Sequence, residues 1–216
     1  LSQNPVAGAA ILGVGTTNVK VYAEDASGNI DSITVIVTTK DVMAPTAVCK
    51  DINLYLDGTG SAVITGADID NGSTDNCSAL SFFVSKTNFN CADVGAPVSV
   101  TLTATDVNGN FSTCNSLVTV LDTISPTVNV KTFNLVLDAT GNGTLLPSDV
   151  NNGSFDNCGA IALSVAPNTF SCGDQGSAVV TLTAVDSYGN SSSKNVAITI
   201  ETSLNINIIT LNNCEI

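Results

Sequence analysis

Three residue types are missing from this chain of 216 residues, which contains no histidine, no tryptophan and no arginine. Histidine is the usual general base of enzymes and the commonest ligand of transition metals, so its absence argues against both roles. Positive charge is scarce as well, because 6 lysines stand against 19 acidic residues and leave a formal net charge of −13. Since phosphate groups are bound through cationic side chains, this composition argues against a nucleic-acid partner.

Long apolar runs are also absent. No run approaches the roughly 18 residues of a membrane-spanning helix, and the opening "LSQNPVAGAA" lacks the basic start of a signal peptide. Hydrophobic residues nevertheless make up 44% of the chain, which is enough to build packed cores. Because the sequence begins partway through a repeating pattern, we expect a fragment or a processed piece of a longer protein.

The sequence repeats with a period of 81 residues. "DASGNIDSITVIVTTKDVMAPT" at 25–46 returns as "DVNGNFSTCNSLVTVLDTISPT" at 106–127, and Pro45 recurs as Pro126. Such self-similarity is the mark of an array of structural modules. It predicts four parts: residues 1–45 as the C-terminal half of a repeat, 46–126 and 127–203 as complete repeats, and 204–216 as the start of a following module or a tail.

Hydrophobic residues alternate within each repeat with a period of two. In "VSVTLTATD" at 98–106, the residues Val98, Val100, Leu102 and Ala104 share one face, and serine and threonine occupy the other. No segment shows a convincing helical period. Short half-buried strands joined by Gly/Asn turns such as "DVNGN" and "DSYGN" predict an all-β chain of tandem Ig-like antiparallel β-sandwich repeats, arranged end to end.

The seven cysteines differ between the two complete repeats in an informative way. One pair is retained 81 positions further on, and a second pair is replaced in the last repeat by Val130 and Lys194. Retention and loss in pairs predicts the disulfides Cys49–Cys114, Cys77–Cys91 and Cys158–Cys172, and leaves Cys214 without a visible partner. Free buried thiols are the alternative, and a metal–thiolate site is disfavoured because no C-x-x-C spacing occurs. Disulfides of this kind imply an oxidising, extracellular setting.

The order "TDNC", "VTLTATDVNGNFSTC" and "VTVLDTISPT" resembles the hyalin-repeat (HYR) module, an extracellular Ig-like domain. The last repeat matches with "FDNC" and "VTLTAVDSYGN", but it lacks the outer cysteine pair and ends in "ETSLN" instead of "DTISPT". Arrays of this kind, rich in Asn, Thr and Asp, are similar to those of giant cell-surface adhesins of gliding bacteria with type IX secretion. That resemblance implies a stalk or filament that carries adhesion, with neighbouring repeats of the same chain as its partners, and no catalysis.

Acidic and amide side chains recur at three places that an Ig-like sandwich brings to one pole: the entry linker, the loop after the second strand and the final hairpin. Converging carboxylates repel one another unless a cation bridges them. Ca²⁺ takes six to eight oxygen ligands and tolerates irregular loops. The sequence therefore predicts Ca²⁺ at the joints between repeats, where it would stiffen the linkers. The candidate ligands are Asp41, Asp68, Asp70, Asp75, Asn76, Asp106, Asn108 and Asn110 for the middle repeat, and Asp122, Asp149, Asn151, Asp156, Asn157, Asp186 and Asn190 for the last.

Other interpretations remain open from the sequence. The same side chains could cap their own backbone in Asx turns, with Gly72 and Gly153 supplying positive φ angles. The chain could instead be a module that binds a glycan or a protein, although 3 tyrosines, 7 phenylalanines and no tryptophan offer few stacking surfaces for a sugar. A third alternative is a self-assembling extracellular fibre whose subunits exchange strands.

Overall fold

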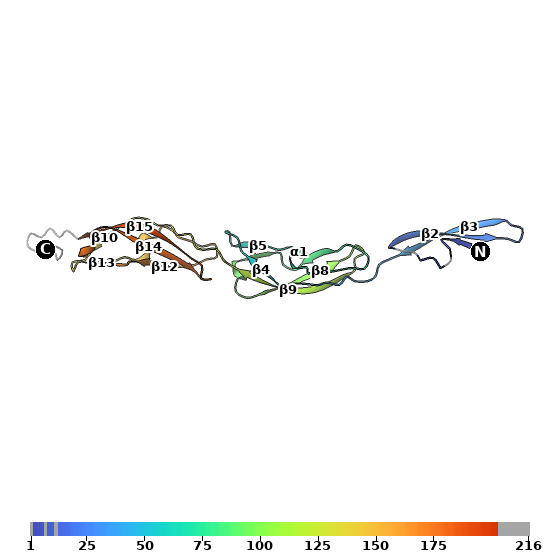
Figure 1. The fold of residues 1–216 in the computed structure, drawn as a ribbon, viewed down its shortest axis with the longest axis horizontal. Coiled ribbons are helices and arrows are strands. Elements are labelled where there is room, and N and C mark those ends of the chain that lie inside the picture. Colours follow the sequence, from blue (N-terminus) through green and yellow to red (C-terminus); the bar gives the residue numbers. More distant parts are fainter. Residues whose placement is uncertain (1, 7, 11–12, 203–216) are drawn as a thin grey trace, which may run out of the picture. The chain divides into compact units, whose positions relative to one another are not determined.

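The computed structural model describes residues 2–6, 8–10 and 13–202 (Figure 1), so the expected module at 204–216 lies outside the described residues. The chain divides into two compact units: Leu1–Ile52, Ile64–Thr87 and Val98–Val118 form the first, and Asn53–Val63, Asn88–Pro97 and Thr119–Ile216 form the second. Among the described residues, no helix has the length and apolar character of a membrane span. The prediction of an all-β chain of tandem β-sandwich repeats is confirmed.

The N-terminal segment is a three-stranded antiparallel sheet of β1 (Ser2–Asn4), β2 (Gly15–Glu24) and β3 (Ile30–Thr39). A five-residue turn joins β2 to β3, closed by the hydrogen bond that the Asp25 amide donates to the Asn29 carbonyl at 2.9 Å. Val19 is buried in this sheet, whereas the apolar side chains of Ile33 and Ile36 on β3 are exposed.

The middle repeat has one four-stranded sheet in the order β4-β9-β8-β6 and a second sheet formed by β5 and β7. Its elements are β4 (Ile52–Tyr55), β5 (Ser61–Val63), α1 (Gly66–Ile69), β6 (Ser81–Val84), β7 (Asn88–Asn90), the 3₁₀ turn η1 (Cys91–Asp93), β8 (Val98–Thr105) and β9 (Phe111–Leu121). The alternation expected for residues 98–106 is observed, because Val100, Leu102 and Ala104 are fully buried on one face of β8.

The last repeat has the same topology, with the sheet β10-β15-β14-β12 beside the pair β11-β13. Its elements are β10 (Phe133–Leu137), β11 (Asn142–Thr144), α2 (Pro147–Val150), β12 (Ile161–Ala166), β13 (Thr169–Ser171), η2 (Cys172–Asp174), β14 (Gly176–Asp186) and β15 (Ser191–Thr202). The strands β14 and β15 run side by side (Figure 1), and their inward side chains, including Leu182 and Ile198, form one hydrophobic core with β10 and β12.

The glycine hairpins agree with the sequence-based prediction, and the one-turn helices do not. The hairpins expected at "DVNGN" and "DSYGN" are confirmed, with positive φ angles of 89° at Gly109 and 92° at Gly189. The one-turn helices α1 and α2 were not expected, because four residues are too short to show a helical period. The hairpins matter for the site, because each begins at an aspartate that the turn holds in place.

Candidate metal centres at the repeat joints

Three aspartates gather at each of two corresponding positions in the chain. Asp41, Asp75 and Asp106 form the first group, and Asp122, Asp156 and Asp186 form the second; within each group one carboxylate oxygen per residue lies within 4.8 Å of the others. In each case the first aspartate belongs to the linker before the repeat, the second to the loop after the one-turn helix, and the third to the start of the last hairpin. The three elements that the sequence predicted at one pole therefore meet.

In the first group, each carboxylate uses its hydrogen bonds to shape its own loop. Asp41 Oδ1 accepts from the Met43 amide at 3.0 Å, and Asp75 Oδ2 accepts from the amides of Cys77 and Ser78, both at 3.0 Å. Asp106 Oδ1 accepts from two amides of the hairpin, and its Oδ2 accepts from Asn110 Nδ2 at 2.7 Å. These are Asx-turn contacts, and they fix the direction of each carboxylate.

The second group repeats this arrangement. Asp122 Oδ1 accepts from the Ile124 amide at 3.1 Å, and Asp156 Oδ2 accepts from the Cys158 amide at 2.8 Å. Asp186 Oδ1 accepts from two hairpin amides, and its Oδ2 accepts from Asn190 Nδ2 at 2.7 Å. The two groups come from segments of different sequence, yet equivalent hydrogen bonds hold the three carboxylates of each.

The oxygens left over by these turns point to a ligand. Asp41 Oδ2, Asp75 Oδ1, Asp122 Oδ2 and Asp156 Oδ1 are buried and have no hydrogen-bond partner, and the same is true of Asn157 Oδ1. The linker acids are themselves deeply buried, since Asp41 is 8% and Asp122 6% exposed. A buried carboxylate oxygen without a partner is costly, and several of them around one point are satisfied by a cation. All the donors are oxygens, which suits Ca²⁺.

Asn110 and Asn190 tie each hairpin to the linker. Asn110 Nδ2 donates to the Asp41 carbonyl at 3.2 Å as well as to Asp106, and Asn190 Nδ2 donates to the Asp122 carbonyl at 3.2 Å as well as to Asp186. Their amide nitrogens face the acids, so these two residues support the carboxylates. We had expected them as direct ligands.

Hydrogen bonding changes the acidity of the hairpin aspartates. Burial raises the pKa of Asp106, but the bonds donated by the Asn110 side chain, by its amide and by the amides of Asn108 and Gly109 outweigh this, and the net pKa is lowered. The pKa of Asp186 is lowered in the same way, against a similar effect of burial, by Asn190 and the amides of Tyr188 and Gly189. Both side chains are therefore ionised at neutral pH and available to a cation.

Replacing Asn110 should make the free energy of unfolding depend less on the charge of Asp106. In calcium-free buffer, Asn110→Ala is expected to raise the pKa of Asp106 towards its ordinary value. A lowered pKa stabilises the folded state above the unfolded pKa, and this contribution is lost as the pH falls through the folded pKa. The variant should therefore be less stable than the wild type at neutral pH, and the difference should narrow as the pH falls below about 4.

Urea unfolding at neutral and acid pH measures this difference, with Asn115→Ala as the matched control. Asn115 accepts a hydrogen bond from the Thr101 hydroxyl at 2.8 Å and contacts no carboxylate through it. Its replacement should cost the same at both pH values. A loss in Asn110→Ala that does not narrow in acid would contradict the role assigned to the Asp106 charge.

Several predicted ligands lie outside the two groups of aspartates and have hydrogen bonds of their own. Asp68 and Asp149 cap the one-turn helices: Asp68 accepts from the Thr65 amide at 2.7 Å and Asp149 from the Leu146 amide at 2.8 Å. Turns occupy the others: Asp70 accepts from the amides of Gly72 and Ser73, Asn151 from Ser154, and Asn108 contributes its backbone amide to Asp106. The Asn76 side chain is exposed and donates to Cys77 Sγ at 2.9 Å.

The disulfides differ from the expected set in part. Cys49 and Cys114 are joined, the pairing that the sequence favoured. The expected Cys77–Cys91 and Cys158–Cys172 bonds are wrong, because Cys91 is joined to Cys158 and Cys77 is a free, exposed thiol. Cys172 is also disulfide-bonded. The bond between Cys91 and Cys158 connects the middle repeat to the last one.

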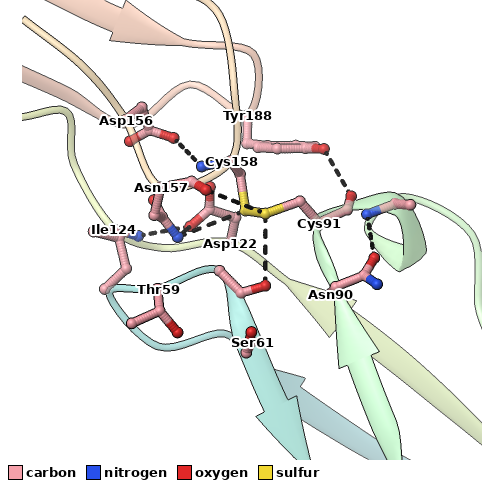
Figure 2. Close-up of a disulfide and its surroundings, with 12 residues drawn as sticks. Thr59, Ser61, Asn90, Cys91, Asp122, Ile124, Asp156, Asn157, Cys158 and Tyr188 are labelled. Carbon is pink, nitrogen blue, oxygen red and sulfur yellow. Dashed lines mark hydrogen bonds between the residues drawn. A yellow bond between two sulfur atoms is a disulfide. The ribbon is translucent and has the colours of Figure 1, made fainter.

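That inter-repeat disulfide lies next to the second acid group (Figure 2). Asn157, between Asp156 and Cys158, donates through Nδ2 to the Asp57 carbonyl of the middle repeat at 3.2 Å and to Asp122 Oδ1 at 3.3 Å. The backbone of the middle repeat approaches closely here, since a Cβ added at Gly60 would lie 2.6 Å from Cys91 Sγ. The disulfide, the linker acid and Asn157 thus share one joint.

At the corresponding place in the first group, Cys77 has no such bond. Partial desolvation of the thiol and the nearby carboxylates of Asp41, Asp75 and Asp106 raise the pKa of Cys77. The sequence had indicated that Cys77 was bonded, because it recurs as Cys158. Its free state is therefore the clearest difference between the two joints.

Comparison with known proteins gives a similarity of fold alone. No family model and no curated protein matches the chain, so the hyalin-repeat resemblance rests on its motifs. The solved structures that match include extracellular cadherin domains 1–4 of protocadherin gamma B7, with 15% identity and a TM-score of 0.33 over 87% of this chain and 58% of that one. Mouse clustered PcdhgC3 EC1-3 has 15% identity and a TM-score of 0.33, over 88% and 77%. Human protocadherin-24 EC1-2 has 13% identity and a TM-score of 0.39, over 74% and 98%.

Proposed function

We propose that this chain forms structural repeats of the stalk or filament of a secreted bacterial cell-surface adhesin, of the hyalin-repeat type, and that Ca²⁺ rigidifies its joints. The observation that carries the proposal is the set of buried, partnerless oxygens on Asp41, Asp75, Asp122 and Asp156. They occur twice, at the same two places in consecutive repeats. A feature that recurs at both described joints suits a role in the array, whereas a site for one ligand would be needed only once.

The position of the linker acids explains how a cation would stiffen the joint. Asp41 and Asp122 lie in the segments that enter the middle and last repeats, and the other two carboxylates of each group belong to the repeat itself. Without a cation, three like charges repel one another and push the linker away. One Ca²⁺ bound to all three would attach the linker to the repeat that follows it. The array would then transmit a pull along its length with less swivelling.

Two further observations support an extracellular setting and a role in adhesion. Disulfides persist in oxidising compartments, and this chain carries two between described cysteines. The motifs "TDNC" and "FDNC", each followed by a "VTLTA" strand and a glycine hairpin, resemble those of surface adhesins of gliding bacteria. The acidic surface also suits a repeat that must not stick to its neighbours, since net charge favours solubility.

Titration calorimetry with Ca²⁺ tests the metal part of the proposal. We expect two binding events per chain, one for each acid group, and the Asp41→Asn variant should lose one of them. The linker provides a second readout, because Val42 and Met43 are well exposed and a protease that cuts at apolar residues can reach them. Calcium should slow cleavage there. Absence of binding heat together with unchanged cleavage would refute the calcium joint.

The adhesion part has its own test. Electron microscopy of the native material should show filaments at the cell surface that carry this chain along their length. If an isolated repeat instead binds a glycan on an array, the chain is a ligand-binding module and its stalk role falls, whatever the outcome with calcium.

A further inference from the structure

The bond between Cys91 and Cys158 gives a pairing rule that can be applied to the corresponding cysteines of the other repeats. Cys91 is the second of the two cysteines retained in each repeat, and Cys158 is the first such cysteine of the next. The bond therefore runs forward from one repeat to its successor. Cys172 occupies the position of Cys91 in the last repeat, and it too is disulfide-bonded.

The rule leaves one open position. Cys77 corresponds to Cys158, so its partner should be a cysteine 81 positions before Cys91. That position is Ala10. Cys77 is accordingly free and exposed, although its loop matches that of Cys158: the Cys77 amide donates to Asp75 Oδ2 at 3.0 Å, as the Cys158 amide donates to Asp156 Oδ2 at 2.8 Å.

The two loops differ where the bond would act. Asn157 is half-buried and lies next to the disulfide (Figure 2). Its Nδ2 donates to the Asp57 carbonyl of the preceding repeat at 3.2 Å. Asn76 is exposed, and its Nδ2 donates to Cys77 Sγ at 2.9 Å. The first joint therefore has a formed loop, a complete acid group and an accessible sulfur, and the position that corresponds to Cys91 is an alanine.

We propose that Cys77 is a covalent docking site for a second polypeptide, which supplies a cysteine like Cys91, placed directly after a short strand of a β-sandwich repeat. The partner's sulfur would lie against the loop of Cys77 in the way that Cys91 lies against the loop of Cys158. The same contacts that surround the observed disulfide define the fit: a glycine that leaves room for the sulfur, as Gly60 does, and a turn carbonyl for the asparagine, as Asp57 provides. The proposal does not depend on the calcium sites or on the adhesin assignment.

The bond forms by two exchange steps with a small-molecule disulfide as the oxidant. The Cys77 thiolate attacks one sulfur of the oxidant, and a mixed disulfide forms as one small thiolate leaves. The partner's thiolate then attacks the Cys77 sulfur and releases the second small thiolate. Two protein thiols lose two electrons and two protons, and the oxidant takes them up as two thiols.

A second copy of this chain serves as the probe. The donor carries Cys77→Ser and Cys158→Ser, which removes its own acceptor and leaves Cys91 unpaired. Donor and wild-type chain are mixed in glutathione disulfide and followed on non-reducing gels, and the linkage is mapped by mass spectrometry of peptides. We expect a heterodimer joined by Cys77 and Cys91.

Two matched controls measure how specific the bond is. A control acceptor with Cys77→Ser and Ser27→Cys moves the thiol to the exposed turn between β2 and β3. A control donor with Cys77→Ser and Cys114→Ser presents Cys49 instead of Cys91. The proposed pair should react at least about tenfold faster than either control pair, because access and surroundings decide which sulfur is attacked.

Three results would overturn the proposal: equal rates with the controls, a dominant dimer joined by two copies of Cys77, or a wild-type chain whose peptide map shows Cys77 already bonded within the chain. A folding defect of the donor is detected from its melting curve. A second donor with Cys158→Ala in place of Cys158→Ser then repeats the measurement.

Discussion

Chelation of calcium is expected to lower the melting temperature of this chain by about 10–20 °C. A ligand present at about 100 times its Kd stabilises the folded state by about 2.7 kcal/mol per site. In a domain of about 80 residues, each kcal/mol corresponds to a shift of about 4–8 °C. Scanning calorimetry with saturating Ca²⁺ and then with EDTA measures the difference.

Variants of two aspartates with nearly the same local structure can distinguish metal binding from turn formation. Asp186 accepts hydrogen bonds from the amides of Tyr188 and Asn190, both at 2.8 Å, and Asp138 accepts from those of Thr140 and Asn142 at 2.8 and 3.0 Å. Only Asp186 belongs to an acid group. Asp186→Asn should abolish the calcium response of the last repeat, and Asp138→Asn should keep it. Equal calcium responses in the two variants would mean that the acid group binds no ion.

The sequence presented Asx turns and calcium as alternatives, but the structure contains the first and is suited to the second. A carboxylate has two oxygens: in Asp75 and Asp156 one oxygen accepts the amides of the loop and the other is buried without a partner. Residue type and spacing predicted which loops would meet. They could not assign individual oxygens, because that depends on the direction of each side chain.

The same limit explains why the sequence could not separate the acids of the two groups from acids that cap helices. Asp68 follows Thr65 by three positions, as in a capping box, and this spacing could have identified it as a helix cap. Asp149 follows Leu146, which has no hydroxyl to complete that motif, so its role needed the structure. A one-turn helix adds too little periodicity to be recognised, yet it uses one acid per repeat as its cap.

The disulfides show a limit particular to repeats. Paired retention correctly grouped Cys49 with Cys114, since both are lost together from the last repeat. It could not distinguish a bond within each repeat from a bond between consecutive repeats, because both schemes retain the same two cysteines at the same spacing. Distance decides, and Cys91 and Cys158 have Cα atoms 5.2 Å apart.

Removing the Cys49–Cys114 disulfide is expected to destabilise the middle repeat by about 4 kcal/mol, the chain-entropy value for a closed loop of this length. The bond spans 65 residues and joins the entry of the repeat to β9. A small sandwich has a limited core, so this is a large share of its stability. Guanidinium unfolding of the Cys49→Ala, Cys114→Ala double variant, compared with the wild type in the same buffer, measures the loss.

The last repeat supplies the reverse experiment, because Val130 and Lys194 occupy the two corresponding positions. The backbone there has the same pairing: Val130 is bridged to Asn151 as Cys49 is bridged to Asp70, and Lys194 faces Leu182 as Cys114 faces Leu102. The double variant Val130→Cys, Lys194→Cys should therefore form a disulfide and gain about as much as the middle repeat loses. If the loss and the gain agree, loop closure is the cause. A loss without a matching gain would assign the effect to local packing around the Cys49 and Cys114 side chains. Such packing is specific to the middle repeat, whereas loop closure would act equally in both repeats.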